Sequence, residues 1–206
     1  MINKTKFILK SKLPIILASR SDSRKKILSD TGLEFEQIVS GVNEEDVKKK
    51  FKIKSYTFLA KKLAEEKALF VSKMKKNAYV IGADQICVKK NKVFNKPNFK
   101  KNALKQLSML NGKTHKQISA VCLTYNEKII WSYVETAKMK MKNLSTAVLK
   151  SYIDKDMPLK SCGSYKFEDN GKYLFSEVDG NTNTILGLPI LPLLNVLHKK
   201  KIITYA

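Results

Sequence analysis

One carboxylate of this chain stands in an unusual setting. Asp84 ends the triplet Gly82-Ala83-Asp84 inside an apolar run over residues 79–88. A carboxylate in such a run is costly to bury unless it has a partner. The two small residues before it leave room for a metal-bound phosphate or an activated water to approach the backbone. Buried acids tend to mark functional sites, and the alternative is a solvent-facing aspartate at the end of a strand.

A second segment combines hydroxyl groups with a cation. The apolar run over residues 13–18 is followed by Ser19, Ser21 and Arg24, where a helical pattern begins. A strand that ends in a tight loop and a helix N-terminus presents backbone N–H groups, the positive end of the helix dipole and the arginine to one small volume, which suits phosphate. The alternative is an ordinary strand-to-helix loop with capping serines.

An acidic cluster interrupts the otherwise basic sequence. Glu44, Glu45 and Asp46 lie in what we interpret as a loop over residues 41–46. Together with Asp84 they could hold Mg²⁺ or Mn²⁺, which take oxygen ligands and keep several waters. An acidic loop can equally be a solvated one.

Two lysines are candidates for phosphate contacts. Lys67 lies one helical turn after Leu63, on or near the apolar face of the clearest helix, so it could reach a phosphate site or extend its ammonium to solvent. Lys96, which precedes Pro97, is equally open to both interpretations.

Other kinds of site are excluded by spacing. The sequence Gly112-Lys113-Thr114 is not a phosphate-binding P-loop, because position 107 is leucine and a helix precedes it. The three cysteines form no C-x-x-C pair, and two histidines are too few for a zinc set. Reduced thiols in a cytoplasmic protein are the expectation.

Alternating periodicities predict an α/β fold with a mixed sheet, since hairpins and helical crossovers both occur. We expect one domain over residues 1–206. Helices are expected over residues 24–30, 57–74, 102–110, 145–156 and from 190 to about 199, and strands over 13–18, 34–39, 79–88 (interrupted at 82–84), 116–125, 129–141, 164–167 and 173–178.

The charge is strongly positive. Forty Lys and Arg face eighteen Asp and Glu, for a net charge of +22. A basic surface favours polyanions, but the lysines are spread along the chain, so we expect nucleic-acid binding to be nonspecific if it occurs. The apolar run at 13–18 is shorter than the core of a signal peptide, and no run approaches membrane-spanning length.

Taken together, these segments resemble the Maf family of nucleoside triphosphate pyrophosphatases, over about residues 15–199. The family patterns L-A-S-x-S-P-R-R, V-D-E, L-A-x-x-K-A, G-A-D, K-P and G-L-P correspond in order to residues 17–24, 42–44, 63–68, 82–84, 96–97 and 187–189. Each pattern is weak alone, and six in the right order and spacing are specific.

The resemblance implies an elongated mixed sheet flanked by helices, in two lobes with an active-site cleft, similar to inosine triphosphatases. It also implies cleavage between the α and β phosphorus of a nucleoside triphosphate, with Mg²⁺ or Mn²⁺ as cofactor, and makes a homodimer plausible. In the family, the residue matching Asp84 is the proton acceptor and a metal ligand with Glu44, while the residues matching Ser19, Arg24, Lys67 and Lys96 bind phosphate.

Three positions bear on the base. Ser23 matches neither the arginine of the dTTP/UTP subgroup nor the aromatic residue of the 7-methyl-GTP subgroup, whereas Gln85 and Glu168 resemble the latter. One carboxylate can accept both the N1–H and the 2-amino group of guanine, so we expect Glu168 to favour a guanine-type base. The alternatives are a dTTP/UTP pyrophosphatase and a non-enzymatic regulator of cell division that binds nucleotide or nucleic acid.

Overall fold

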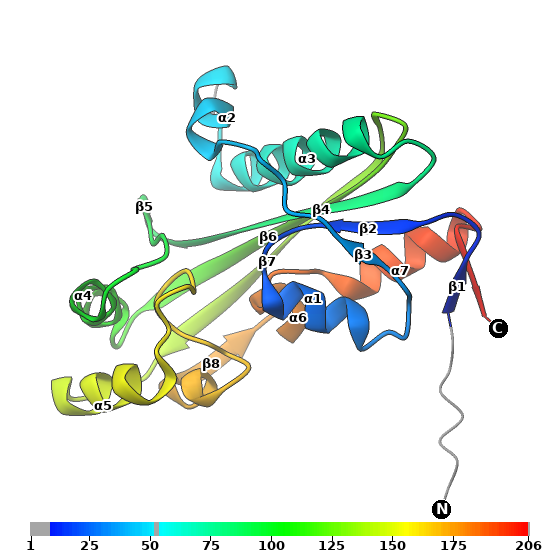
Figure 1. Ribbon diagram of the computed structural model, residues 1–206. Helices are drawn as coiled ribbons and strands as arrows, with labels where there is room; N and C mark the ends of the chain where they lie inside the picture. Colours follow the sequence, from blue (N-terminus) through cyan, green and yellow to red (C-terminus); the bar gives the residue numbers. More distant parts are fainter. Residues whose placement is uncertain (1–8, 52–53, 206) are drawn as a thin grey trace, which may run out of the picture. The chain divides into compact units, whose positions relative to one another are not determined.

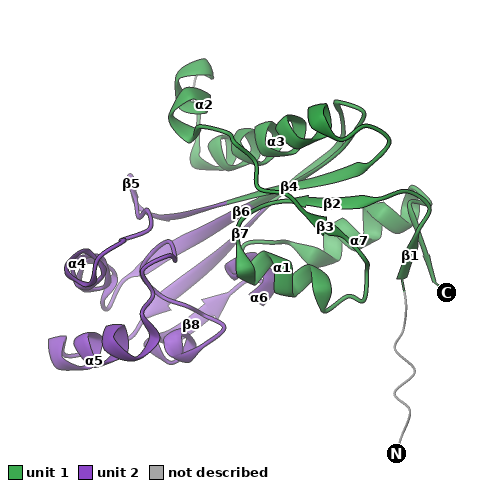
Figure 2. Cartoon of the chain, in the orientation of Figure 1, with its two compact units in different colours: residues 1–84, 120–134, 187–206 green, residues 85–119, 135–186 purple. Residues whose placement is uncertain are grey.

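The computed structural model describes residues 9–51 and 54–205, which divide into two compact units. Figure 2 shows unit 1 in green and unit 2 in purple. Of the described residues, unit 1 comprises 9–51, 54–84, 120–134 and 187–205, and unit 2 comprises 85–119 and 135–186. Three long strands, β4 (Tyr79–Lys89), β6 (Thr114–Tyr125) and β7 (Lys128–Met141), contribute residues to both.

The remaining elements are helices and short strands. The helices are α1 (Asp22–Ser29), α2 (Glu44–Lys50), α3 (Tyr56–Met74), α4 (Lys100–Leu110), α5 (Thr146–Asp156), the 3₁₀ helix η1 (Asn170–Leu174), α6 (Thr182–Ile185) and α7 (Ile190–Lys199). The other strands are β1 (Leu9–Ser11), β2 (Ile15–Ala18), β3 (Glu36–Gln37), β5 (Lys92–Val93), β8 (Phe175–Asp179) and β9 (Ile203–Tyr205).

The main sheet is mixed, as the sequence predicts. Its strand order is β3-β2-β4-β6-β7-β8, with β5 paired to β4. β2 runs parallel to both β3 and β4, whereas β7 and β8 are antiparallel. The expected α/β fold with a mixed sheet flanked by helices is therefore confirmed.

In unit 1, helices cover both faces of the sheet. α3 lies on one face, and α1 and α7 lie on the other (Figure 1). The packing of α3 on β4 is very close at Gly82, where an added Cβ would lie 2.3 Å from the Ala64 oxygen and 2.8 Å from the Ala68 Cβ. A side chain at position 82 would force α3 away from β4. The small residues Gly82, Ala64 and Ala68 therefore set the distance between α3, which carries Lys67, and the strand.

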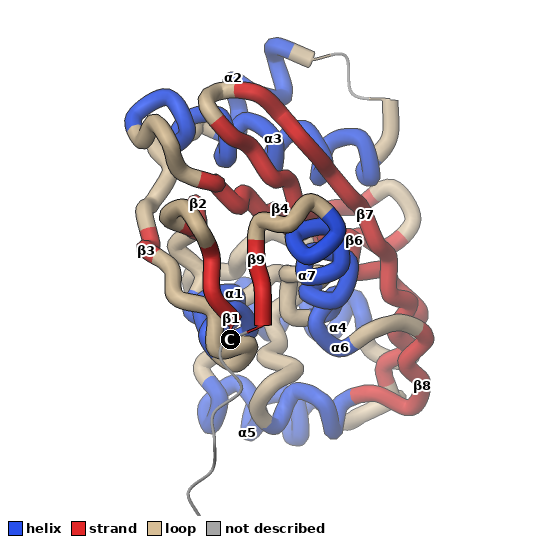
Figure 3. The backbone as a smooth tube through the Cα atoms, turned by 90° about the vertical axis from the view of Figure 1, so that its right-hand side faces the viewer, coloured by secondary structure: helices blue, strands red, loops and turns tan. Residues whose placement is uncertain are grey.

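A small two-stranded sheet lies apart from the main one. β1 and β9 pair antiparallel, with Leu9 opposite Tyr205, and lie side by side in Figure 3. The sequence analysis did not predict either strand, because three residues are too few to show an alternating pattern.

Unit 2 has its own apolar core. α4 and α5 pack against each other. The core includes Phe94, Leu107, Met139, Leu149 and Tyr165. Within residues 9–51 and 54–205, no helix is both long enough and apolar enough to span a membrane.

Three local expectations were wrong. Residues 44–46 are not in a loop but form the first turn of α2, which Asn43 caps; acidic residues at its start and lysines at its end both complement the helix dipole. Residues 164–167 are not a strand, because Ser164 has a left-handed φ of 64° and a turn follows Tyr165. Strand β4 continues through residues 82–84 without interruption.

Candidate active site

The loop between β2 and α1 is organised by two serines. Ser21 caps α1 and accepts a hydrogen bond from the backbone N–H of Arg24, while the buried Ser19 hydroxyl accepts from the N–H of Ser21. Because β2 and β4 are parallel, with Ala18 beside Gly82, this loop follows β2 at the same edge of the sheet that carries Asp84. The topology therefore brings together the first two segments that the sequence analysis selected.

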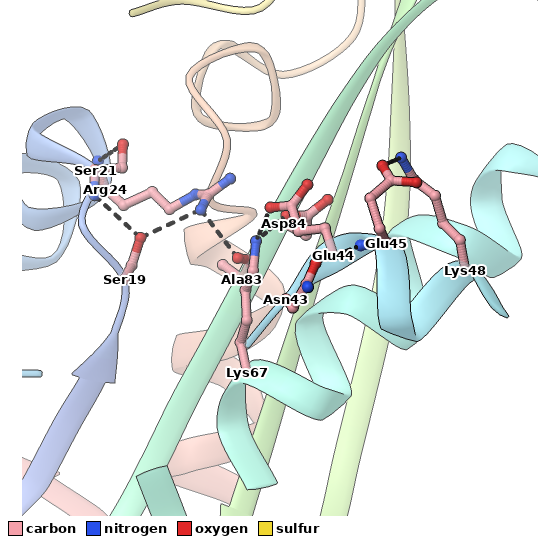
Figure 4. A network of polar contacts seen from close by, with 10 residues as sticks. All are labelled: Ser19, Ser21, Arg24, Asn43, Glu44, Glu45, Lys48, Lys67, Ala83 and Asp84. Atoms are coloured by element: carbon pink, nitrogen blue, oxygen red, sulfur yellow. Dashed lines mark hydrogen bonds and ion pairs between the residues drawn. The ribbon is translucent and has the colours of Figure 1, made fainter. Parts of the chain in front are cut away.

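Arg24 ties three segments of unit 1 together. Its Nη1 donates to the Ser19 hydroxyl at 3.2 Å and to the Ala83 carbonyl at 2.9 Å, and its Nε donates to the Gly187 carbonyl at 2.8 Å. Figure 4 shows the side chain extending from α1 toward β4. The carbonyls of Ala83 and Gly187 thus hold the guanidinium close enough to Asp84 for its charge to act on that carboxylate.

Lys67 joins two carboxylates. Its Nζ lies 2.5 Å from Asp84 Oδ1 and 2.8 Å from Glu44 Oε1 (Figure 4). The Asp84 and Lys67 side chains are 8% and 14% exposed, whereas Glu44 is 52% exposed, so one end of the arrangement is buried and the other faces solvent. Asp84 is therefore buried and paired rather than solvent-facing.

Burial and charge shift the protonation of this pair in identifiable ways. Burial is the largest influence on the pKa of Asp84 and raises it above the ordinary value, although the charges of Lys67 and Arg24 oppose that rise. Burial lowers the pKa of Lys67, but the neighbouring Asp84 and Glu44 outweigh it, so the net shift is upward. Asp84, with its raised pKa, therefore suits the role of a general base. Lys67, which stays charged, suits the role of a cation that binds an anion beside it.

The site residues named from the sequence fall into two groups. Ser19, Arg24, Glu44, Lys67 and Asp84 gather in unit 1 through the contacts above. A sixth residue of unit 1, Ser23, is half-buried on α1, next to Arg24 in the chain.

The other three belong to unit 2. Lys96 is exposed between β5 and α4, Gln85 lies on β4 directly after Asp84, and Glu168 is exposed in the segment before η1. Their roles toward a nucleotide stay predictions.

Sequence reasoning missed part of this site. The carbonyls of Ala83 and Gly187 hold Arg24, and a backbone acceptor leaves no trace in residue type. Only the G-L-P pattern marked the region of Gly187.

Comparison with known proteins identifies the family of this chain. A family model described as "Maf-like protein" matches residues 14–200. A protein of Legionella pneumophila (strain Corby) named "Nucleoside triphosphate pyrophosphatase" is 43% identical over 190 residues, covering 92% of this chain and 95% of its own length. Proteins of the same name from Bradyrhizobium diazoefficiens and Pelagibacter ubique are each 39% identical, covering 94% and 85% of this chain and 97% and 92% of their own lengths.

The family match and these relatives extend over nearly the whole chain. The chain therefore belongs to the Maf family.

Proposed function

We propose that this protein hydrolyses nucleoside triphosphates to the monophosphate and pyrophosphate. The observation that carries the proposal is the buried Asp84–Lys67 pair, with oxygen and nitrogen 2.5 Å apart, next to the backbone that Arg24 holds. The name that the relatives share, nucleoside triphosphate pyrophosphatase, supports the same reaction.

In this reaction a water oxygen attacks the α-phosphorus, and the bond from that phosphorus to the oxygen bridging to the β-phosphorus breaks. Asp84 accepts the proton of the attacking water, and its raised pKa brings it closer to a working base. Lys67 and Arg24 offset charge on the phosphates as pyrophosphate leaves with the bridging oxygen.

The charge of the site also supports a divalent cation. The side chains of Arg24 and Lys67 balance those of Glu44 and Asp84, so these four groups offer no net positive charge to a triphosphate. The carboxylates of Glu44 and Asp84 both contact the same cation, the ammonium of Lys67. Glu44 and Asp84 would hold Mg²⁺ or Mn²⁺, with phosphate and water oxygens as further ligands. Such an ion, when bound, stabilises negative charge on phosphate oxygens.

For the base, we propose a guanine-type nucleotide such as 7-methyl-GTP. Glu168 is exposed on unit 2 and can accept hydrogen bonds only, which matches the adjacent donors of guanine. A hydrogen bond to a charged group contributes about 1.5–3 kcal/mol, enough for a tenfold or greater preference.

A product assay on a panel of triphosphates tests both parts. GTP, 7-methyl-GTP, dTTP and UTP are each incubated with the protein and Mg²⁺ or Mn²⁺, and the products are separated. We expect pyrophosphate and monophosphate in equal amounts; orthophosphate and diphosphate instead would refute the reaction. Glu168→Gln should lower the ratio of guanine to pyrimidine turnover by about tenfold, and an unchanged ratio would remove Glu168 from base selection.

A further inference from the structure

A second polar cluster surrounds the short helix α6. Thr184, which is fully buried, donates its hydroxyl to the carboxylate of Glu135. Its carbonyl accepts from the Ser119 hydroxyl at 2.6 Å and from Gln85 Nε2 at 3.3 Å. The same Gln85 nitrogen donates to the carbonyl of Ile185 at 2.6 Å. All five residues belong to unit 2.

These contacts compensate for an intrinsic weakness of α6. A helix of four residues cannot be stable alone, because nucleation is costly and its last carbonyls have no partners within the helix. Here side chains from the neighbouring strands β4, β6 and β7 satisfy those carbonyls and hold the threonine hydroxyl. The cluster is therefore an anchor that fixes one turn of backbone on the sheet.

Two residues of this anchor, Gln85 and Ile185, are close in the chain to residues of the candidate active site. Gln85 follows Asp84 in the chain, and Ile185 precedes Gly187 by two residues. The Gly187 carbonyl accepts from Arg24 Nε at 2.8 Å. A displacement of the anchored backbone would thus be transmitted through the chain to the carboxylate and to an acceptor of the guanidinium.

We propose that Gln85 and Ser119 are positioning residues, which fix α6 and through it the placement of Asp84 and of the Gly187 carbonyl. This proposal rests on the proposed function. It gives Gln85 a role other than base recognition: both hydrogens of its side-chain amide are directed at backbone carbonyls, so only its oxygen could meet a base, and only as an acceptor.

The experiment compares Gln85→Met, Ser119→Ala and the double variant in pyrophosphate release from a guanine and a pyrimidine triphosphate. Positioning predicts that kcat falls roughly tenfold in each single variant, by the same factor for both substrates and with little change in KM. The double variant should lose far less than the product of the single losses, because both side chains hold one turn of helix.

Two further variants separate positioning from a general loss of stability. Thr184→Ser keeps the hydroxyl and should retain most of the activity, whereas Thr184→Val should lose about as much as Ser119→Ala. Ser72→Ala is the control: it removes a different buried serine hydroxyl, one that accepts from the backbone N–H of Glu127, and should leave kcat unchanged.

The outcomes distinguish the two proposals. Variants of an active protein that keep the wild-type kcat overturn the positioning role and leave the function intact. A change in the ratio of guanine to pyrimidine turnover confined to Gln85→Met would make it a base-reading residue instead. A wild-type protein that releases no pyrophosphate refutes the proposed function, and the positioning role with it.

Hydrogen exchange tests the anchor independently of activity. Exchange of the backbone N–H groups at residues 184–187 is expected to be faster in Ser119→Ala than in the wild type, and unchanged exchange would contradict the anchor.

Discussion

Two buried polar regions of this molecule handle charge in opposite ways. In unit 1, Asp84 is buried beside the ammonium of Lys67. In unit 2, the Tyr165 hydroxyl lies 2.8 Å from His115 Nε2 and accepts from Gln117 Nε2 at 2.7 Å, and all three residues are at least 95% buried. One region pairs opposite charges, whereas the other is a cluster of neutral hydrogen bonds.

The environment of His115 explains the contrast. Burial, and secondly the charge of Lys89, lowers the pKa of His115 to about 4, so the ring is neutral at neutral pH. Histidine is the residue type most often used in proton transfer, yet this one is held in a structural network. Both groups are buried, but only Asp84 has groups of opposite charge beside it, and this separates Asp84 from His115.

The largest effect on stability should come from breaking the ion pair. Lys67→Met leaves the Asp84 carboxylate buried without its closest cation, and we expect the free energy of unfolding to fall by about 3–5 kcal/mol. Urea unfolding monitored by circular dichroism measures this. Lys26→Met, which removes an ion pair that is exposed on both sides, is the control and should cost less than about 1 kcal/mol. Equal losses in the two variants would contradict the assignment of a buried pair.

Breaking the neutral cluster should cost less. Tyr165→Phe leaves buried donors or acceptors on His115 and Gln117 without the hydroxyl they share, at a cost of about 1–3 kcal/mol in the free energy of unfolding. Tyr173→Phe, at a tyrosine that is 65% exposed, is the matched control and should have almost no effect. Pyrophosphate release per folded molecule should stay at the wild-type level in both variants, and a specific loss in Tyr165→Phe would show that the cluster takes part in the chemistry.

The neutral cluster also predicts a dependence of stability on pH. The unfolded chain protonates His115 near pH 6.5, and the folded chain only near pH 4, so the unfolded state binds more protons between these values. Stability contributed by the neutral ring is therefore lost as pH falls, by about 2 kcal/mol between pH 7 and pH 5. Unfolding curves of the wild type and His115→Gln at both pH values isolate this part. If the two proteins lose stability equally, His115 is not the group responsible.

The smallest effect should come from the exposed end of the charged region. Glu44→Gln removes a carboxylate that is 52% exposed, and water screens its attraction to Lys67. We expect the free energy of unfolding to change by less than about 1 kcal/mol, measured in urea as for Lys67→Met. A loss as large as that of Lys67→Met would mean that Glu44 and Asp84 contribute equally to holding the lysine.

The sequence predicted features that depend on local pattern. The periodic apolar stripe located α3, and the order of short motifs selected Asp84, Lys67 and Arg24, which the fold brings together. Features that depend on distant partners were missed. Ser119 stands inside the apolar stretch of β6, and that was its only signal, since its acceptor lies 65 residues away on Thr184.

The most direct measurement is pyrophosphate release by Asp84→Asn compared with the wild type, with folding verified by circular dichroism. Asparagine keeps the shape of the side chain and cannot accept the proton of water, so the rate should fall by about 10²–10⁴-fold while the protein stays folded. A folded Asp84→Asn protein that releases pyrophosphate at the wild-type rate would contradict the claim that Asp84 accepts the proton of the attacking water.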